Sequence, residues 1–382
     1  MPRRQTHQTE PHGIVEQEIE DEEAETQAVI QTPEHDHFQD KDFFYEYLLE
    51  RYDGFESLFE FLKLKPLVFL ALQPIVGDIY LDKRGRKSFF NNPNDRLLLL
   101  YLFCRYNNLK MIRDMCIPYI RTNEQISREI DLSASLFRVP LQNACIAFRN
   151  ENLLNTGVSS IVDCTVTPTR RPNGDFASAM GFYSGKYKMY CVKVEVIVNA
   201  ESGTASFVSK AVQGADHDMT ILKNTSETIN NMLGTTKIIG DKGYKGFDLY
   251  IPTGSVSKES PLKEKGCLIE RYFGRIKMVF KFTREKYLKD FVSFDNLFVI
   301  SCCFCNEDIE INPLENQDAT NYMNIMTNYL NKIEKRREAH KKSSLIYRRR
   351  QREQFDVLEN ELRLIQEEES QNSDETEIEH FD

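Results

Sequence analysis

The chain has 382 residues, with 49 Lys and Arg against 59 Asp and Glu and a formal net charge of −10. Its length predicts two or three domains, and its hydrophobic fraction of 41%, with 25 Phe and 17 Tyr, excludes a wholly disordered chain. No apolar run approaches the roughly 20 residues that span a bilayer, and the polar N-terminus lacks the apolar stretch of a signal peptide. The nine Cys follow no regular spacing, which is typical of reduced thiols. We therefore expect a soluble, intracellular protein.

The charge is distributed unevenly along the chain. Residues 1–60 hold 4 Lys and Arg against 17 Asp and Glu, a net charge of −13, so the remaining residues sum to +3. Residues 161–300 hold 20 basic against 15 acidic residues, a local charge of +5. An acidic overall charge therefore does not exclude a polyanionic partner, although a charge of +5 is equally typical of an ordinary surface.

The N-terminal third divides into a tail and a helical region. Residues 1–40 are poor in apolar side chains and contain the run EQEIEDEEAE, which predicts a disordered acidic tail. Residues 41–150 have helical spacing of Leu and aromatic side chains. Within them, residues 93–148 predict three short helices, the first capped by Asn94 or Asp95 and running through RLLLLYLFCRY. Such a set fits a helix-turn-helix DNA-binding segment, and a plain helical bundle fits nearly as well.

Residues 157–306 predict a mixed α/β layout. The segment SSIVDCTVTP predicts a strand, and the alternation in YCVKVEVIVNAESGTASFVSKAV predicts a hairpin with its turn at Ser202 and Gly203. A helix then follows over DMTILKNTSETINNML with Asp218 as its N-cap, and TTKIIG predicts a short buried strand. The last helix of this set covers CLIERYFGRIKMVFKF. The order strand, hairpin, helix, strand, helix indicates a central mixed sheet flanked by helices.

Residues 315–382 predict a charged helical tail with a basic block from Lys332 to Arg352 and an acidic end. A solvated helix is the commonest structure for such a run. A nuclear-import signal or a patch that binds phosphates is the alternative.

Three acidic residues occupy positions suited to chemistry. Asp163 is predicted at the end of the first strand, and Asp241 directly follows the strand KIIG, between Gly240 and Gly243. Carboxylates past strand ends project into the crevice where open α/β sheets bind ligands. Glu270 lies on the last helix, beside the apolar stripe predicted to pack on the sheet, which comprises Ile269, Phe273, Ile276 and Phe280.

Three carboxylates suit Mg²⁺ or Mn²⁺, which prefer oxygen ligands. The alternative is turn capping by the two aspartates. Basic residues near these acids are expected to contact a phosphate backbone; they are Lys186, Lys188, Arg271, Arg275, Lys277 and Lys281. Gly274 is expected to leave room beside Glu270. Cys302, Cys303 and Cys305 lie close in sequence, but buried thiols are favoured over a zinc site because no His or second Cys pair accompanies them.

Five segments resemble the catalytic domain of DDE transposases of the PIF/Harbinger type, which are related to bacterial insertion-sequence transposases. In the family's order they are VDCTVTPTRRP, FYSGKYKMYCVKVEVIVN, GADHDMTIL, IIGDKGY and IERYFGRIKMVFKF. The resemblance implies an RNase H-like fold in which two Asp and one Glu bind a divalent cation. On this chain those residues fall on Asp163, Asp241 and Glu270.

The resemblance also places the family's His-Asp pair on His217 and Asp218. Asp218 either caps its helix or competes with Asp241 for the second acidic role, and the geometry of the strand favours Asp241. The 28 residues between Asp241 and Glu270 are fewer than the family's pattern has.

The resemblance implies a metal-dependent transposase that cleaves phosphodiester bonds at transposon ends and transfers the strand to target DNA. The alternative is a domesticated, catalytically inactive protein that binds DNA or a protein partner. Expected partners are DNA, a second copy of the chain and an accessory DNA-binding protein, with no membrane. The expected location is the nucleus in a eukaryotic host and the cytoplasm otherwise.

Overall fold

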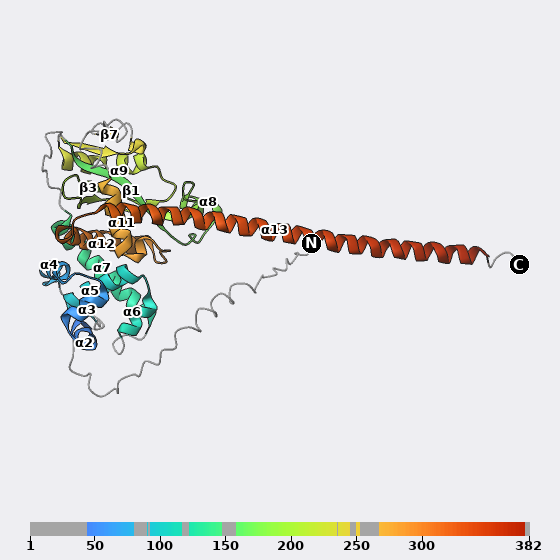
Figure 1. Ribbon diagram of the computed structural model, residues 1–382, viewed down its shortest axis with the longest axis horizontal. Helices are drawn as coiled ribbons and strands as arrows, with labels where there is room; N and C mark the ends of the chain where they lie inside the picture. The colour runs from blue at the N-terminus through green and yellow to red at the C-terminus, as the bar shows by residue number, and fades with distance from the viewer. Residues whose placement is uncertain are drawn as a thin grey trace, which may run out of the picture. The chain divides into compact units, whose positions relative to one another are not determined.

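The computed structural model describes residues 44–79, 90, 92–116, 122–146, 158–234, 236–244, 250–252 and 267–378. The predicted acidic tail, residues 1–40, lies outside the described residues. A seven-stranded mixed sheet forms the centre of the structure, and helices precede and follow it (Figure 1). The strands are β1 (Val158–Pro168), β2 (Tyr183–Ser184), β3 (Met189–Asn199), β4 (Ala205–Val208), β5 (Val212–Gln213), β6 (Lys237–Gly240) and β7 (Tyr250–Pro252).

The main path of the sheet runs β2-β3-β1-β6-β7, while β4 and β5 pair with β3. Strand β1 pairs with β3 in antiparallel and with β6 in parallel orientation, and β6 pairs with β7 in parallel. The predicted hairpin is present as β3 and β4, and the turn between them contains Gly203 at a φ of 75°. The predicted central mixed sheet flanked by helices is confirmed.

Helices cover both faces of the sheet. Helix α9 (Asp218–Leu233) packs its apolar side chains on Val162, Ile197 and Ile238 of one face. Helix α11 (Leu268–Val279) packs on the opposite face, and its predicted stripe of Ile269, Phe273, Ile276 and Phe280 is buried. Alternate residues of β1 therefore point to opposite layers, which fixes the layer that each polar side chain of the strand meets.

The helical region before the sheet contains six helices within the described residues, joined to the α11 face by one continuous hydrophobic core. They are α2 (Phe44–Arg51), α3 (Phe55–Leu62), α4 (Pro66–Val76), α5 (Pro93–Tyr106), α6 (Leu109–Met115) and α7 (Asn123–Cys145). Two short helices and one of 23 residues replace the three short helices expected over 93–148. Helix α5 is buried on every side from Leu97 to Cys104, so its whole surface belongs to the core.

The residues that begin α5 differ from the prediction. Asn92 caps the helix by accepting a hydrogen bond from the Asn94 backbone N–H, with Pro93 at the first position. Asp95 is buried and accepts instead from the backbone N–H groups of Phe44 and Tyr45, at 3.1 and 2.8 Å. It therefore caps α2, a contact between distant parts of the chain that local spacing does not indicate.

Two helices complete the described chain. Helix α12 (Phe291–Ile311) packs on α7 and buries Cys302, Cys303 and Cys305, in agreement with the prediction of buried thiols. Helix α13 (Asn316–Ile378) begins against α11 and then continues beyond it (Figure 1). Within the described part of the chain, no helix has both the length and the apolar composition of a membrane span.

Candidate functional site

Asp163 lies in the middle of β1 rather than at its end. The parallel pairing with β6 ends at Ile161, whereas the antiparallel pairing with β3 continues as far as Pro168. The predicted strand end is therefore wrong for β1 as a whole, because β3 supports five further residues. The pairing with β6, in contrast, ends two residues before Asp163.

Asp241 follows β6 directly, as predicted. The parallel register pairs Ile161 with Ile239, and two further residues along each strand lead to Asp163 and Asp241. Since side chains alternate along a strand, Asp163 is on the same face as Ile161, which belongs to the core on the α11 side, whereas Asp241 begins the turn directly after β6. The turn after β6 is closed by the Gly243 N–H, which donates to Asp241 Oδ1 at 2.5 Å.

Gly243 lies between two carboxylates. A Cβ added to it would be 2.8 Å from Asp241 Oδ1 and 3.3 Å from Asp218 Oδ2. The absence of a side chain at this position thus lets the turn after β6 approach the first turn of α9. Asp218 and Asp241 both border this point.

The electrostatics of Asp163 reflect this gathering of acids. Burial raises the pKa of Asp163 to about 7, against a hydrogen bond of 2.7 Å from the Cys164 backbone N–H. The nearby carboxylates of Asp241 and Asp218 raise the pKa further, while Lys186 lowers it. Perturbation by burial together with like charges is typical of functional sites.

Asp218 is the first residue of α9, and His217 occupies the N-cap position without a side-chain capping bond. The prediction that Asp218 is the N-cap is therefore wrong by one residue. Its carboxylate instead accepts a hydrogen bond from Lys193 Nζ at 2.9 Å, and that ammonium also donates to the Asp216 carbonyl at 2.5 Å. Asp218 thus has a cation partner from β3 at the edge of the acidic cluster.

Glu270 lies in the first turn of α11 and is half-buried. Tyr322 of α13 lies near both Glu270 and Asp163, since the charges of both act on it. Its ring packs on Phe273 at 5.5 Å between centroids. Burial raises the pKa of Tyr322 well above its usual value, and the nearby carboxylates of Asp163 and Glu270 raise it further. Tyr322 was not among the predicted site residues, because the charged composition of its helix indicated only a solvated tail.

The donors at this site are oxygens of carboxylates, the type that Mg²⁺ and Mn²⁺ prefer. Among the residues that the structure describes, no three His, Cys, Asp or Glu side chains meet closely enough to hold a metal ion as they stand. Burial and the nearby carboxylates of Asp241 and Asp218 raise the pKa of Asp163, which indicates a concentration of negative charge that a divalent cation would compensate. The donor set therefore fits such a cation.

A buried polar network lies beneath the turn that carries Asp241. The Tyr244 hydroxyl is 3.2 Å from Cys164 Sγ, and Glu195 of β3 is the residue paired with Cys164 across the sheet. Burial raises the pKa of Glu195 to about 8, against hydrogen bonds from Thr225 and Tyr244. Sequence analysis missed this network, although an acid in the apolar alternation of β3 was a signal for it.

Two of the predicted DNA-binding residues are buried, so those predictions are wrong. Lys277 is fully buried, and its Nζ donates to the carbonyls of Val166 and Thr283 at 2.7 and 2.8 Å. Burial lowers the pKa of Lys277 to about 7. Lys277, which was expected to face solvent, therefore binds backbone carbonyls inside the protein.

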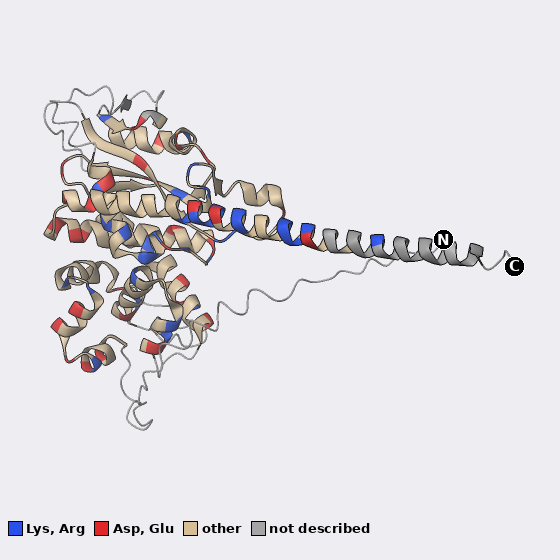
Figure 2. Cartoon of the chain, turned by 45° about the vertical axis from the view of Figure 1, so that its right-hand side comes forward, with Lys and Arg blue, Asp and Glu red and all other residues tan. Residues whose placement is uncertain are grey.

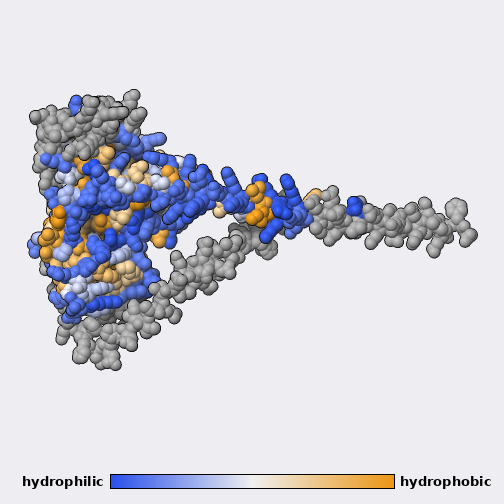
Figure 3. Space-filling model, viewed as in Figure 1, coloured by the Kyte–Doolittle hydropathy of each residue, from blue (hydrophilic) through white to orange (hydrophobic). Residues whose placement is uncertain are grey.

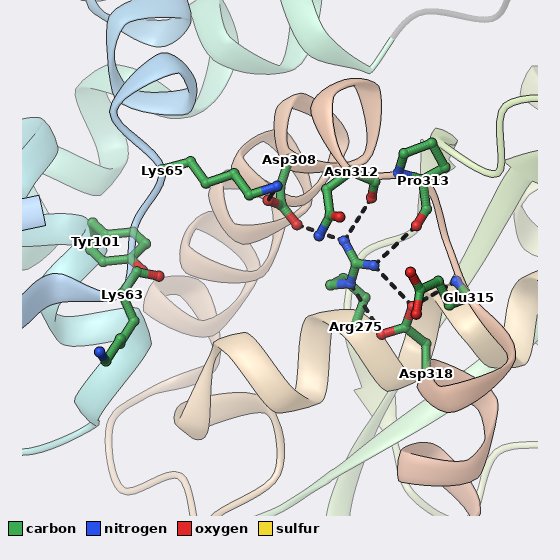
Figure 4. Close-up of polar contacts among 9 residues, drawn as sticks. All are labelled: Lys63, Lys65, Tyr101, Arg275, Asp308, Asn312, Pro313, Glu315 and Asp318. Carbon is green, nitrogen blue, oxygen red and sulfur yellow. Dashed lines mark hydrogen bonds and ion pairs between the residues drawn. The ribbon is translucent and has the colours of Figure 1, made fainter. Parts of the chain in front are cut away.

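Arg275, the second of them, joins three elements (Figure 4). Its guanidinium binds Asp318 of α13 in bidentate geometry at 2.9 and 3.1 Å, and Asp308 of α12 at 2.7 Å. It also donates to the carbonyls of Asn312 and Pro313. Gly274 does leave room, but for the backbone of Asp318, which contacts the position where a Cβ would stand.

Four of the predicted basic residues are not fully buried. Lys186 and Lys188 are exposed before β3, and Lys186 Nζ lies 5.2 Å from the ring centroid of Tyr187. Arg271 and Lys281 are half-buried, and Arg271 donates to Asn316 Oδ1 at 2.5 Å. A second group of cations follows along α13, where Figure 2 shows successive turns of Lys and Arg.

Comparison with known proteins gives one match. The family model described as DDE superfamily endonuclease matches residues 162–306, which include Asp163, Asp218, Asp241 and Glu270. No curated protein and no solved structure matches the chain.

Proposed function

We propose that the chain is a metal-dependent nuclease and transposase, because residues 162–306 match the family model of DDE superfamily endonucleases. In this proposal it cleaves phosphodiester bonds at the ends of a DNA element and joins the freed 3′ end to target DNA. The Harbinger type of the family is part of the proposal. So are the nuclear location in a eukaryotic host and an accessory DNA-binding protein.

The observation that carries the proposal is the position of Asp163 on β1 and of Asp241 directly after the adjacent parallel strand β6. These two acids, with α11 and its Glu270 packed on the sheet, fit the two Asp and one Glu that the resemblance implies. The raised pKa of Asp163 supports the same assignment, since it is caused by burial and, in addition, by the nearby carboxylate of Asp241.

Asp163, Asp241 and Glu270 would hold the divalent cations, and Asp218 would border them. A pair of such ions, when bound, supplies charge neutralisation at the attacking and leaving oxygens of the phosphodiester. The chain's own residues orient that site. The Gly243 N–H holds one oxygen of Asp241, and the Cys164 N–H holds one oxygen of Asp163.

Lys186 is the cation best placed to bind a phosphate next to this site. It is exposed, and its charge lowers the pKa of Asp163, which places it within electrostatic range of the acids. Lys188 and Lys281 would extend the contact along the backbone of the DNA. The basic segment of α13 would add contacts that do not depend on sequence.

A labelled duplex tests the proposal. The duplex carries DNA that flanks the chain's own gene, and it is incubated with the purified protein, Mg²⁺ or Mn²⁺ and an unlabelled target. Shorter labelled strands report hydrolysis, and longer ones report joining. Asp163→Ala is expected to abolish both products, while Glu201→Gln, an exposed acid in the β3–β4 turn, retains them.

Equal products from the wild type and Asp163→Ala would contradict the assigned site. Binding of the duplex without any cleavage by the wild type would instead favour the inactive, domesticated protein. Terminal inverted repeats and a short target duplication around the gene are expected for a functional element, and their absence would also favour domestication.

A further inference from the structure

Helix α13 has 63 residues, about 95 Å at roughly 1.5 Å per residue. Only its first part packs on the protein, through Tyr322 and Met326, which are each 7% exposed, and through Tyr329, which donates to the Arg284 carbonyl. Beyond Tyr329 the described side chains are nearly all exposed. An isolated, highly charged helix of this length gains little stability from its own hydrogen bonds, so it commonly needs a partner.

The exposed part of α13 carries large apolar side chains. Tyr347, Phe355 and Leu358 are 63%, 67% and 57% exposed, and their spacing of i, i+8, i+11 places them on one face of the helix. The sequence continues this spacing at Leu362 and Ile365. Leu345 and Ile346 are also 65% and 55% exposed, and Figure 3 shows an apolar patch partway along the helix. We call Tyr347, Phe355 and Leu358 the α13 stripe.

The net charges before and after the middle of the α13 stripe have opposite signs. Residues 332–352 hold ten Lys and Arg against two Glu, a net charge of +8. Residues 353–378 hold ten Asp and Glu against one Arg, a net charge of −9. The sign changes between Arg352 and Glu353, midway between Tyr347 and Leu358.

This pattern is complementary to itself when one copy is reversed. We propose that α13 pairs with α13 of a second copy of this chain in antiparallel orientation, centred on the junction of Arg352 and Glu353. Each basic segment then lies along the acidic segment of the other copy. Tyr347 lies beside Leu358 of the partner subunit, because both residues are equally far from the junction.

Two other arrangements are less favourable. A parallel pair would set +8 against +8 and −9 against −9, and such like charges repel at close range. Pairing of the two halves within one chain would need a break in the helix near residue 352, but α13 is continuous from Asn316 to Ile378. The second copy therefore fits both the apolar face and the charges.

Cysteine cross-linking of the full chain tests the orientation. Tyr347→Cys and Leu358→Cys proteins are prepared separately, mixed under mild oxidation, and the cross-linked peptides are identified by mass spectrometry, which separates them from disulfides of the exposed Cys267. The antiparallel pair predicts disulfides mainly between the two different variants. Disulfides mainly within each variant would show a parallel pair and overturn the proposal.

Charge reversal tests the cause of the pairing by sedimentation without DNA. A basic-to-acidic variant carries Arg336→Glu, Arg337→Glu, Lys341→Glu and Lys342→Glu, and an acidic-to-basic variant carries Glu361→Lys, Glu367→Lys, Glu368→Lys and Glu369→Lys. Each variant alone is expected to dimerise at least roughly tenfold more weakly than the wild type. An equimolar mixture of the two variants is expected to restore the dimer. A wild type that stays monomeric at all concentrations, or a mixture that fails to dimerise while both variants remain folded by circular dichroism, would overturn the proposal.

Discussion

Asp163 of β1 and Asp241, which directly follows the adjacent parallel strand β6, each lie two residues beyond the paired Ile161 and Ile239. The relative position of the two carboxylates therefore depends on β1 and on the turn that follows β6. β1 lies in the middle of the sheet, whereas Asp241 lies in the turn that follows β6, where it accepts a hydrogen bond from the Gly243 N–H. The turn is therefore the sensitive part of the site.

Gly243→Ala is expected to lower nicking activity while the protein stays folded. The new Cβ would stand 2.8 Å from Asp241 Oδ1, so the carboxylate or the turn must shift. The matched control is Gly185→Ala, because a Cβ at Gly185 meets no atom within 4 Å. Nicking rates and thermal unfolding of both variants check the prediction, and equal rates for the two would contradict it.

Glu195→Gln is expected to reduce the dependence of stability on pH. The pKa of Glu195 is raised to about 8, above its ordinary value, so the folded protein keeps a proton there that the unfolded chain loses at lower pH. The stabilising contribution of the protonated acid is complete below the ordinary pKa and is lost as the pH rises through about 8. Free energies of unfolding from urea titrations at pH 6 and pH 9 measure it. The wild type should lose stability relative to the variant over this interval, and a relative gain would show that the sign is wrong.

Lys277→Met is expected to destabilise the fold by about 1–3 kcal/mol without changing DNA affinity, since it leaves the Val166 and Thr283 carbonyls without their donor. Lys281→Met, the comparison variant on the next turn, is expected to lower DNA affinity without changing the free energy of unfolding. Urea unfolding and a DNA-binding titration separate the two effects. A fall in DNA affinity for a folded Lys277→Met protein would restore the sequence-based assignment of this lysine.

Neutralising the basic segment of α13 is expected to weaken DNA binding without altering sequence preference. Replacement of Arg348, Arg350 and Arg352 by Gln removes cations that meet phosphates, and each lost contact reduces the slope of log affinity against log salt by about 0.9. Binding to a set of duplexes over a range of salt concentrations measures this. A change in the ranking of the duplexes would show that α13 reads bases, and the helix-turn-helix hypothesis for residues 93–148 would then lose its main support.

The sheet and its acids could be predicted from the sequence because strand alternation and turn glycines are local signals. The alternation of β3 fixed the hairpin, and Gly240 and Gly243 marked the turn that carries Asp241. The position of Asp241 directly after β6 follows from such signals. Their roles, with that of Glu270, stay predictions.

The surroundings of α11 could not be predicted in the same way. Its polar side looked solvated, yet α13 covers it through Asp318 and Tyr322, from a segment more than 40 residues away in sequence. Only Gly274 hinted at a close approach, and nothing local showed that a helix backbone would fill the space. Arg275 and Lys277 were therefore assigned to DNA although both are buried inside the protein.

The nicking of supercoiled plasmid in Mg²⁺ or Mn²⁺, with single substitutions at each of four acids, measures which carboxylates the reaction needs. Asp163→Asn, Asp241→Asn and Glu270→Gln are expected to abolish nicking, because each removes a proposed carboxylate ligand of the cation. Asp218→Asn is expected to retain measurable activity, since this carboxylate is already paired with Lys193 at the edge of the cluster. Equal nicking by the wild type and Asp163→Asn, or loss with Asp218→Asn but not with Asp241→Asn, would contradict the account.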